Sequence, residues 1–253
     1  MNTWGCIVAR TPDGGWTNWS IARMMVLDGK RMSGIVSPNQ HIGTVAQAWA
    51  DIGKPMPFAL ALGVEPSIPF ICGMPLPDHV NEADRLGALM QRPIRTGRCR
   101  TIDLDAPASA EILVEGYLHR DELADEGPMG EFAGYVPVEP AMRRPVHHVQ
   151  AVSHRTNAIL PSVAACEPVE ENHTAWGIPT AAQILHELRA AGIPRNHGVD
   201  SAASRLALAG GDGAAQLAQM HRHRRDDRAG PAYRRSGVLH QGRRGHSGAD
   251  PAQ

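Results

Sequence analysis

The sequence predicts an α+β fold in which residues 1–160 form a strand-rich domain, of the β-barrel type or a more open α+β arrangement. Short apolar runs typical of strands alternate in this region with only two short helical segments. The connections between them are rich in Gly and Pro, which favour turns. A mostly helical segment and a tail of unusual composition follow. We therefore expect three regions, at 1–160, 161–194 and 195–253.

The first expected elements are two strands joined by a turn. "WGCIVAR" (4–10) and "WTNWSIARMMVL" (16–27) are apolar runs separated by "TPDGG". "DGK" is a second turn, and "RMSGIV" continues the sheet as a hairpin. The apolar period then becomes helical and ends at Gly53. The residues of this helical face are Ile42, Val45, Ala46, Trp49 and Ile52.

The later elements are read in the same way. Acidic residues in the first turn support a helix at 80–91, because they complement the helix dipole. The remaining expected elements are a buried strand at 57–64, a Pro-rich loop at 65–78, strands at 109–119 and 146–155 on either side of a Gly/Pro loop at 125–135, and a helix at 180–192 closed by Gly192.

The composition is that of a globular protein. The chain has 253 residues, 42% of them hydrophobic, and a net charge of −1. Because no apolar run approaches about 18 residues, we expect no transmembrane helix, and the N-terminus does not resemble a signal peptide. The cysteines are spread out without a CxxC pair, which indicates reduced thiols in a cytoplasmic protein. They are Cys6, Cys72, Cys99 and Cys166.

The tail from Arg195 differs from the rest of the chain. It holds 10 Arg and 5 Asp but no Lys or Glu, so its net charge is +5 and that of the preceding part is −6. A basic tail can bind nucleic acid, but no aromatic residues are interleaved with the charges as single-strand binding requires. A disordered extension is a second interpretation. We favour a third, a reading-frame slip in a GC-rich gene.

Several polar residues are candidates for chemistry. Glu126 and Glu131 lie five apart in a stiff Gly/Pro loop that can present both carboxylates in one cleft, although a solvated acidic turn has the same spacing. His41 and Glu82 each begin a predicted helix, where plain capping is the simpler reading. Together with Asn18 they offer the two oxygens and one nitrogen that suit Mg²⁺ or Mn²⁺ beside a phosphate.

Five stretches of the sequence resemble the UbiD family of decarboxylases, which use prenylated FMN. They are "WTNWSIAR", "SPNQH", "GMPLPDHVNEA", "PASAEILVEG" and "EGPMGEFAGY", and they occur in order between about residues 3 and 194. The "TNWSIAR" stretch is most similar to the ferulic acid decarboxylase branch. The resemblance implies a split β-barrel flavin-binding domain followed by part of an α/β segment, in a chain shorter than the family's members.

The resemblance also assigns roles to residues. It implies a metal site at Asn18, His41 and Glu82 that anchors the cofactor phosphate, and a catalytic set of Arg23, Glu126 and Glu131, with Glu131 as proton donor. A potassium ion would lie near Glu82 and the backbone of Trp19 and Met74, where Ile71 and Cys72 depart from the residues expected. The cofactor contacts implied are Asn18, Ser20, Ile21, Ala22, Arg23, Gln40 and His41.

The function implied is non-oxidative, reversible decarboxylation of an aromatic or α,β-unsaturated carboxylic acid. A flavin prenyltransferase would supply the cofactor, and the family's full-length members are expected to be homo-oligomers without nucleic-acid or membrane partners. The alternatives are a flavin-binding module without activity and an inactive remnant. One geometric problem is open: Asn18 and Arg23 are five apart and point to opposite faces of a regular strand, so we expect a bulge or strong twist between them.

Overall fold

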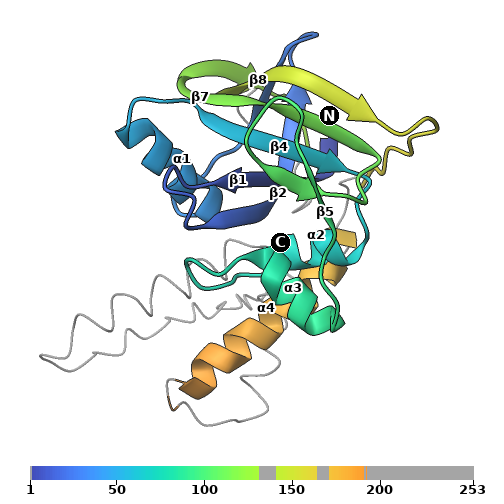
Figure 1. Cartoon of the computed structure of the whole chain (residues 1–253). Coiled ribbons are helices and arrows are strands. Elements are labelled where there is room, and N and C mark those ends of the chain that lie inside the picture. Colours follow the sequence, from blue (N-terminus) through green and yellow to red (C-terminus); the bar gives the residue numbers. More distant parts are fainter. Residues whose placement is uncertain (1, 131–140, 164–170, 191, 193–253) are drawn as a thin grey trace, which may run out of the picture.

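Six antiparallel strands close into a barrel in the order β1-β2-β3-β8-β7-β4 (Figure 1). The structure is a computed structural model that describes residues 2–130, 141–163, 171–190 and 192. The barrel confirms the predicted strand-rich α+β domain. Its strands are β1 (Asn2–Arg10), β2 (Thr17–Val26), β3 (Arg31–Gly34), β4 (Met56–Leu62), β7 (Ile112–Glu126) and β8 (Met142–His154).

The helices gather mainly on one side of the barrel. In Figure 1, α2, α3 and α4 lie below it and α1 lies beside it. A search of the described helices finds none that is long and apolar enough to cross a membrane. The helices are α1 (His41–Asp51), α2 (Ser67–Cys72), α3 (Glu82–Met90) and α4 (Glu171–Ala190), and β5 (Thr96–Arg98) pairs with β6 (Asp105–Pro107) as a separate ribbon.

Strand β1 is buried on both faces because two apolar clusters meet across it. Ile7 belongs to a cluster that includes Phe58 and residues of α1, whereas Val8 belongs to a cluster with residues of α2 and α3. Successive side chains of a strand point to opposite faces, so one apolar run serves both clusters. Strand β4 is likewise buried along its whole length, as predicted. The helices α2 and α3 are thereby fixed against the outside of the barrel.

The structure corrects several element boundaries. Helix α2 lies in the segment predicted as a Pro-rich loop; its prolines, Pro66 and Pro69, occupy the N-cap and the first turn, where a missing N–H costs little. The ribbon β5–β6 was not predicted. Strand β7 continues past residue 119 to Glu126, at the start of the predicted loop, β8 already begins at Met142, and α4 begins before residue 180.

The first turn of α1 packs closely on the turn before it. A Cβ atom on Gly43 would lie 2.0 Å from the backbone oxygen of Ser37, so only glycine fits this position. At the other end, Gly53 adopts φ 66° and ends the helix as predicted. The position of His41, the first residue of α1, is therefore set by a backbone contact.

Candidate functional site

Glu82 joins helix α3 to strand β2 through two hydrogen bonds. Its Oε1 accepts from Asn18 Nδ2 at 2.9 Å, and its Oε2 accepts from the backbone N–H of Trp19 at 2.7 Å. The residue is only 2% exposed. A carboxylate this deeply buried needs such donors to remain charged. Glu82 is therefore held in one orientation at the N-terminus of α3.

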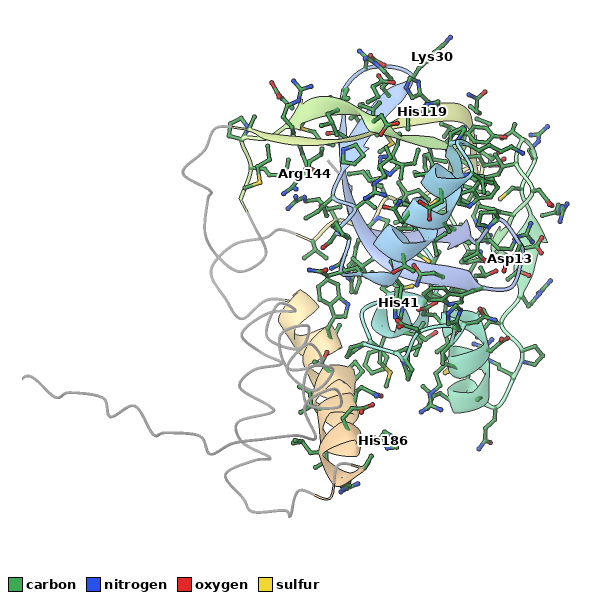
Figure 2. All side chains as sticks on the ribbon, turned by 90° about the vertical axis from the view of Figure 1, so that its left-hand side faces the viewer. Asp13, Lys30, His41, His119, Arg144 and His186 are labelled. Atoms are coloured by element: carbon green, nitrogen blue, oxygen red, sulfur yellow. The ribbon has the colours of Figure 1, made fainter. Side chains whose placement is uncertain are left out.

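His41 lies next to this pair. Its Nδ1 is 3.6 Å from Glu82 Oε1, and its ring packs edge-on against Trp16 with centroids 4.9 Å apart. Figure 2 shows His41 where the barrel meets the helices α2 and α3. The structure thus brings together Asn18, His41 and Glu82, which are far apart in the sequence and which spacing alone could not place.

The donor set fits a hard divalent cation after one adjustment. Within the described residues, no three His, Cys, Asp or Glu side chains are arranged to hold a metal, so a cation held here would need the amide of Asn18 as a third ligand beside His41 and Glu82. At present Asn18 Oδ1 accepts from Ser20 Oγ at 2.7 Å, while its Nδ2 faces Glu82. Amides ligate cations through oxygen, so the amide must turn over, after which Ser20 Oγ can accept from Nδ2.

A second polar cluster surrounds Glu126, the last residue of β7. Its Oε2 lies 2.9 Å from Arg23 Nη2 and 3.6 Å from Arg144 Nε, and its side chain is 2% exposed. Two guanidinium groups thus flank one buried carboxylate. Arg23 and Glu126, two members of the catalytic set that the resemblance implies, are thus in direct contact. The excess positive charge suits a site for a carboxylate ligand.

Arg144 is the residue of this cluster that the sequence did not indicate. It lies on β8 opposite Ala124, two residues along the ladder from the pair formed by Glu126 and Met142. Residues two apart on a strand share a face, which places Arg144 beside Glu126, with Nε 3.6 Å from Oε2. Arg144 could have been placed next to Glu126 only from the register between β7 and β8, which the sequence around Arg144 does not reveal.

The other predicted site residues have more varied surroundings. Ser20 bonds Asn18, and Ile21 lies opposite Cys6 in the sheet. Gln40 is the N-cap residue of α1 but makes no side-chain capping bond. Ala22 belongs to β2, and its side chain is not described. Glu131 lies outside the described residues, as does Cys166.

The irregularity expected between Asn18 and Arg23 lies in the neighbouring strand. The β1–β2 register shifts between Asn2 and Gly5, opposite Arg23. Asn18 and Arg23 contact different carboxylates, Glu82 and Glu126 respectively. One strand therefore carries two separate polar clusters.

The residues expected around a potassium ion lie near the first cluster. The N–H of Trp19 bonds Glu82, and the carbonyl oxygen of Met74 accepts from the N–H of Leu76 at 2.9 Å. Cys72 lies with its Sγ 3.4 Å from that of Cys6. Burial raises the pKa of the Cys72 thiol well above its usual value, so this cysteine behaves as a small apolar residue rather than a thiolate ligand.

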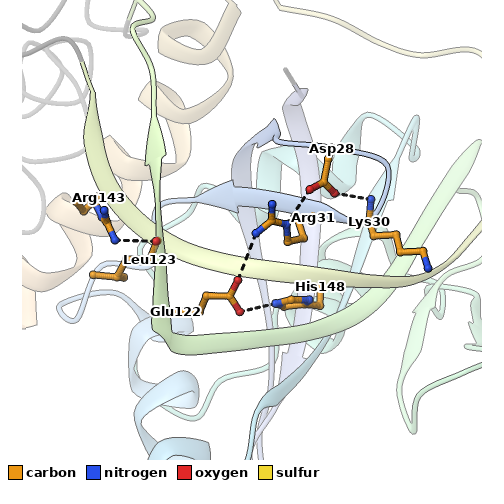
Figure 3. A network of polar contacts seen from close by, with 7 residues as sticks. All are labelled: Asp28, Lys30, Arg31, Glu122, Leu123, Arg143 and His148. Carbon is orange, nitrogen blue, oxygen red and sulfur yellow. Dashed lines mark hydrogen bonds and ion pairs between the residues drawn. The ribbon is translucent and has the colours of Figure 1, made fainter.

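Two other surface features lie away from these clusters. An exposed network on the barrel wall links Arg31, Glu122 and His148 (Figure 3). An apolar cavity of about 250 Å³ is lined by residues that include Trp4 and Pro69. Neither feature includes a residue of the predicted site.

The residues that build the barrel match one protein family. Residues 1–168 match the UbiD family, under the description 3-octaprenyl-4-hydroxybenzoate carboxy-lyase Rift-related domain. The chain belongs to this family. It is 45% identical over 195 residues to pyrrole-2-carboxylic acid decarboxylase of Pseudomonas aeruginosa. It is 40% identical over 196 residues to ferulic acid decarboxylase 1 of Saccharomyces cerevisiae. Each match covers 77% of this chain and 39% of the relative.

A solved structure shares the fold. The UbiD-class enzyme HmfF from Pelotomaculum thermopropionicum, in an evolved dimeric form in complex with prFMN, matches with a TM-score of 0.67 and 32% identity, over 75% of this chain and 43% of that one. The chain thus spans about two fifths of the length of the curated relatives it matches.

Proposed function

We propose that this chain is the cofactor-binding part of a decarboxylase that uses prenylated FMN and a divalent metal. Its substrate is an aromatic or α,β-unsaturated carboxylic acid. The observation that carries the proposal is that strand β2 joins two clusters, Asn18 with Glu82 and His41, and Arg23 with Glu126. The names of its relatives, which are decarboxylases of a pyrrole-carboxylic acid and of ferulic acid, support the same class of substrate.

Asn18, His41 and Glu82 hold Mn²⁺ or Mg²⁺ in this proposal. The cation binds the phosphate of the cofactor, and the dipole at the start of α1 favours the same negative charge. Ser20, Ile21, Ala22, Arg23 and Gln40 complete the cofactor contacts. Potassium is the second cation proposed, beside Glu82 and the backbone of Trp19 and Met74.

Prenylated FMN supplies the electron sink for the carbon that loses CO₂. The chain's own residues bind and orient the acid. Arg23 binds the substrate carboxylate, and Glu126 fixes the guanidinium at 2.9 Å so that its direction is set before substrate arrives. Glu126 interacts with Arg144 as well as with Arg23, so it neutralises the positive charge of Arg23 only in part. The remaining positive charge attracts the substrate carboxylate.

Glu131 delivers the proton to the carbon after CO₂ has left. This role rests on the family resemblance, since Glu131 is outside the described residues. A carboxylic acid in an apolar cleft keeps its proton more readily than one in water, which suits a donor. Because proton transfer and CO₂ loss are both reversible, we propose that the reaction runs in either direction.

The partners proposed are a flavin prenyltransferase as the source of the cofactor and further copies of the chain in a homo-oligomer. The cytoplasm is the compartment proposed, on the pattern of the cysteines. Neither nucleic acid nor membrane is proposed as a partner.

The test is expression of the full chain together with a source of prenylated FMN. Bound flavin is read from the absorption spectrum, and CO₂ release is measured on cinnamic, hydroxybenzoic and pyrrole-2-carboxylic acids. We expect flavin binding that is lost in Glu82→Ala, and turnover that is lost in Arg23→Ala with flavin binding weakened but retained. Flavin binding without CO₂ from any acid supports the alternative, a flavin-binding module without decarboxylase activity. No flavin binding would refute both.

A further inference from the structure

The imidazole of His41 has a carboxylate at each ring nitrogen. Nδ1 lies 3.6 Å from Glu82 Oε1, and Nε2 lies 3.2 Å from Oδ1 of Asp78. A neutral imidazole carries its proton on one nitrogen and a lone pair on the other, and the partner of each nitrogen decides which is which. Asp78 therefore influences whether Nδ1, the nitrogen that faces Glu82, carries a lone pair or a proton.

The segment that carries Asp78 is held in place by strand β2 and the residue before it. Trp16 Nε1 donates to the backbone oxygen of Val80 at 3.3 Å, and the N–H of Thr17 donates to Asn81 Oδ1 at 3.1 Å. The ring of His79 packs on that of Trp16, with centroids 4.9 Å apart. The same Trp16 ring also packs against that of His41, so one side chain contacts both His41 and the residue next to Asp78.

His79 has an unusual backbone conformation. Its φ is 64°, in the left-handed region that few residues other than Gly adopt, although Asn, Asp and His are enriched there. Such strain persists where the surroundings fix the backbone, and it is concentrated at functional sites. Here it turns the chain directly after Asp78, between that residue and α3.

We propose that Asp78 is a positioning residue for His41. Asp78 accepts a hydrogen bond from the N–H at Nε2. The lone pair at Nδ1 is then directed toward Glu82 and Asn18, where it can bind a cation. A carboxylate behind a ligating histidine orients the ring and raises its basicity, and removal of such a partner weakens metal binding by about 10–100-fold. This inference rests on the metal site in the proposed function.

A surface ion pair is the simpler reading of the same contact. The side chain of Asp78 is 64% exposed, and exposed pairs contribute little to stability. The two readings differ in one respect: a surface pair affects neither unfolding nor metal binding strongly, whereas a positioning residue affects metal binding alone.

The experiment measures Mn²⁺ binding to the metal-stripped full chain, by electron paramagnetic resonance of free Mn²⁺, at one pH without flavin. The variants are Asp78→Ala, Asp78→Asn, Asp84→Asn and Glu82→Ala. Asp84 is the matched control, because it is an exposed acid of α3 that bonds Asn81 and makes no contact with His41. Thermal unfolding without metal is recorded for each.

We expect Asp78→Ala to weaken Mn²⁺ binding at least about tenfold, with an unchanged melting temperature. Asp78→Asn keeps an acceptor oxygen and should recover part of the affinity. Asp84→Asn should stay within about threefold of wild type, since it removes only a screened charge. Wild-type affinity in Asp78→Ala, while Glu82→Ala has lost binding, overturns the role of Asp78 alone. If wild type binds Mn²⁺ no better than Glu82→Ala does, the metal site of the proposed function fails, and this inference fails with it.

Discussion

Glu126 Oε2 lies 2.9 Å from Arg23 Nη2, and the carboxylate is almost completely buried. Because Arg144 also lies within 3.6 Å, removing the carboxylate leaves two guanidinium groups close together in a poorly solvated place. Loss of one member of a buried ion pair costs about 3–5 kcal/mol. We expect Glu126→Ala to lower the free energy of unfolding in urea by about that amount.

Glu122→Ala is the control for this prediction. Glu122 is on the same strand and, like Glu126, has two basic partners, Arg31 and His148. Its side chain, however, is 41% exposed (Figure 3). Its loss should cost far less. Equal costs for the two variants would contradict the idea that burial gives the Arg23–Glu126 pair its importance.

His147 should make the barrel sensitive to acid. It is 1% exposed and packs edge-on against Phe58, and burial lowers its pKa to about 3 from 6.5. Between these values the unfolded chain binds the proton and the folded chain does not, so stability falls as pH drops from about 6.5 toward 3. The slope approaches 1.4 kcal/mol per pH unit.

His147→Leu should remove that part of the pH dependence. Within the described residues neither ring nitrogen of His147 has a well-formed hydrogen bond, and the backbone of Pro145 offsets only part of the effect of burial on its pKa, so leucine loses little hydrogen bonding there. The measurement is the urea midpoint at pH 7.5, 5.5 and 4.5 for both proteins. A parallel decline in the two would show that His147 is not the group responsible.

Glu115 should be essential for the loop between β5 and β6. It is fully buried and accepts from the N–H of Arg100 at 2.9 Å, and from both the N–H and the Oγ1 of Thr101 at 2.7 Å. Burial alone would raise the pKa of Glu115, but these bonds outweigh it and hold the pKa below 4.5. Its stabilising contribution is therefore present above pH 4.5 and lost as the pH falls further.

Glu115→Ala should cost about 2–3 kcal/mol, because it removes the charged acceptor of three part-buried hydrogen bonds. Thr101→Val removes one donor and should cost about 1 kcal/mol. Amide hydrogen exchange at Arg100 and Thr101 gives a local readout. Unchanged exchange at both amides in Glu115→Ala would rule out this anchoring role.

Gly73 should control the docking of α4 on α2. A Cβ there would lie 2.2 Å from Trp176 Cδ1, and Trp176 Nε1 donates to the backbone oxygen of Pro69 at 3.3 Å. Gly73→Ala must therefore displace Trp176 and increase hydrogen exchange along α4. Gly97→Ala is the control, because no atom lies within 4 Å of its Cβ position. Equal exchange in the two variants would refute this packing argument.

Much of the barrel could be predicted because its strands follow simple patterns. The apolar runs of β1, β2 and β4 and the helical period of α1 each indicate one kind of element. Helix α2 could not be predicted in this way, since prolines at a helix start resemble those of a loop. The second half of β7 is rich in charged residues because it is largely exposed, and it therefore lacked the apolar signal of a strand.

The site was predicted from residue types together with the family resemblance, and its geometry came only from the fold. Nothing in the spacing of Asn18, His41 and Glu82 requires them to meet; the packing of α1 and α3 against β2 brings them together. Asp78 and Arg144 escaped notice because a charged residue in a loop or on a strand usually faces water. Their roles depend on register and on backbone turns that a single sequence does not reveal.

The closure of the barrel bears on how the chain can acquire its structure during synthesis. Arg31–Ser33 of β3 pair with Val146–His148 of β8. Strand β3 is synthesised early but cannot complete its pairing until β8 has been synthesised. Such long-range pairing is slow to form and leaves strand edges uncovered meanwhile. A nascent chain still lacking β8 exposes the edge of β3, and it is at this stage that a chaperone would be most needed.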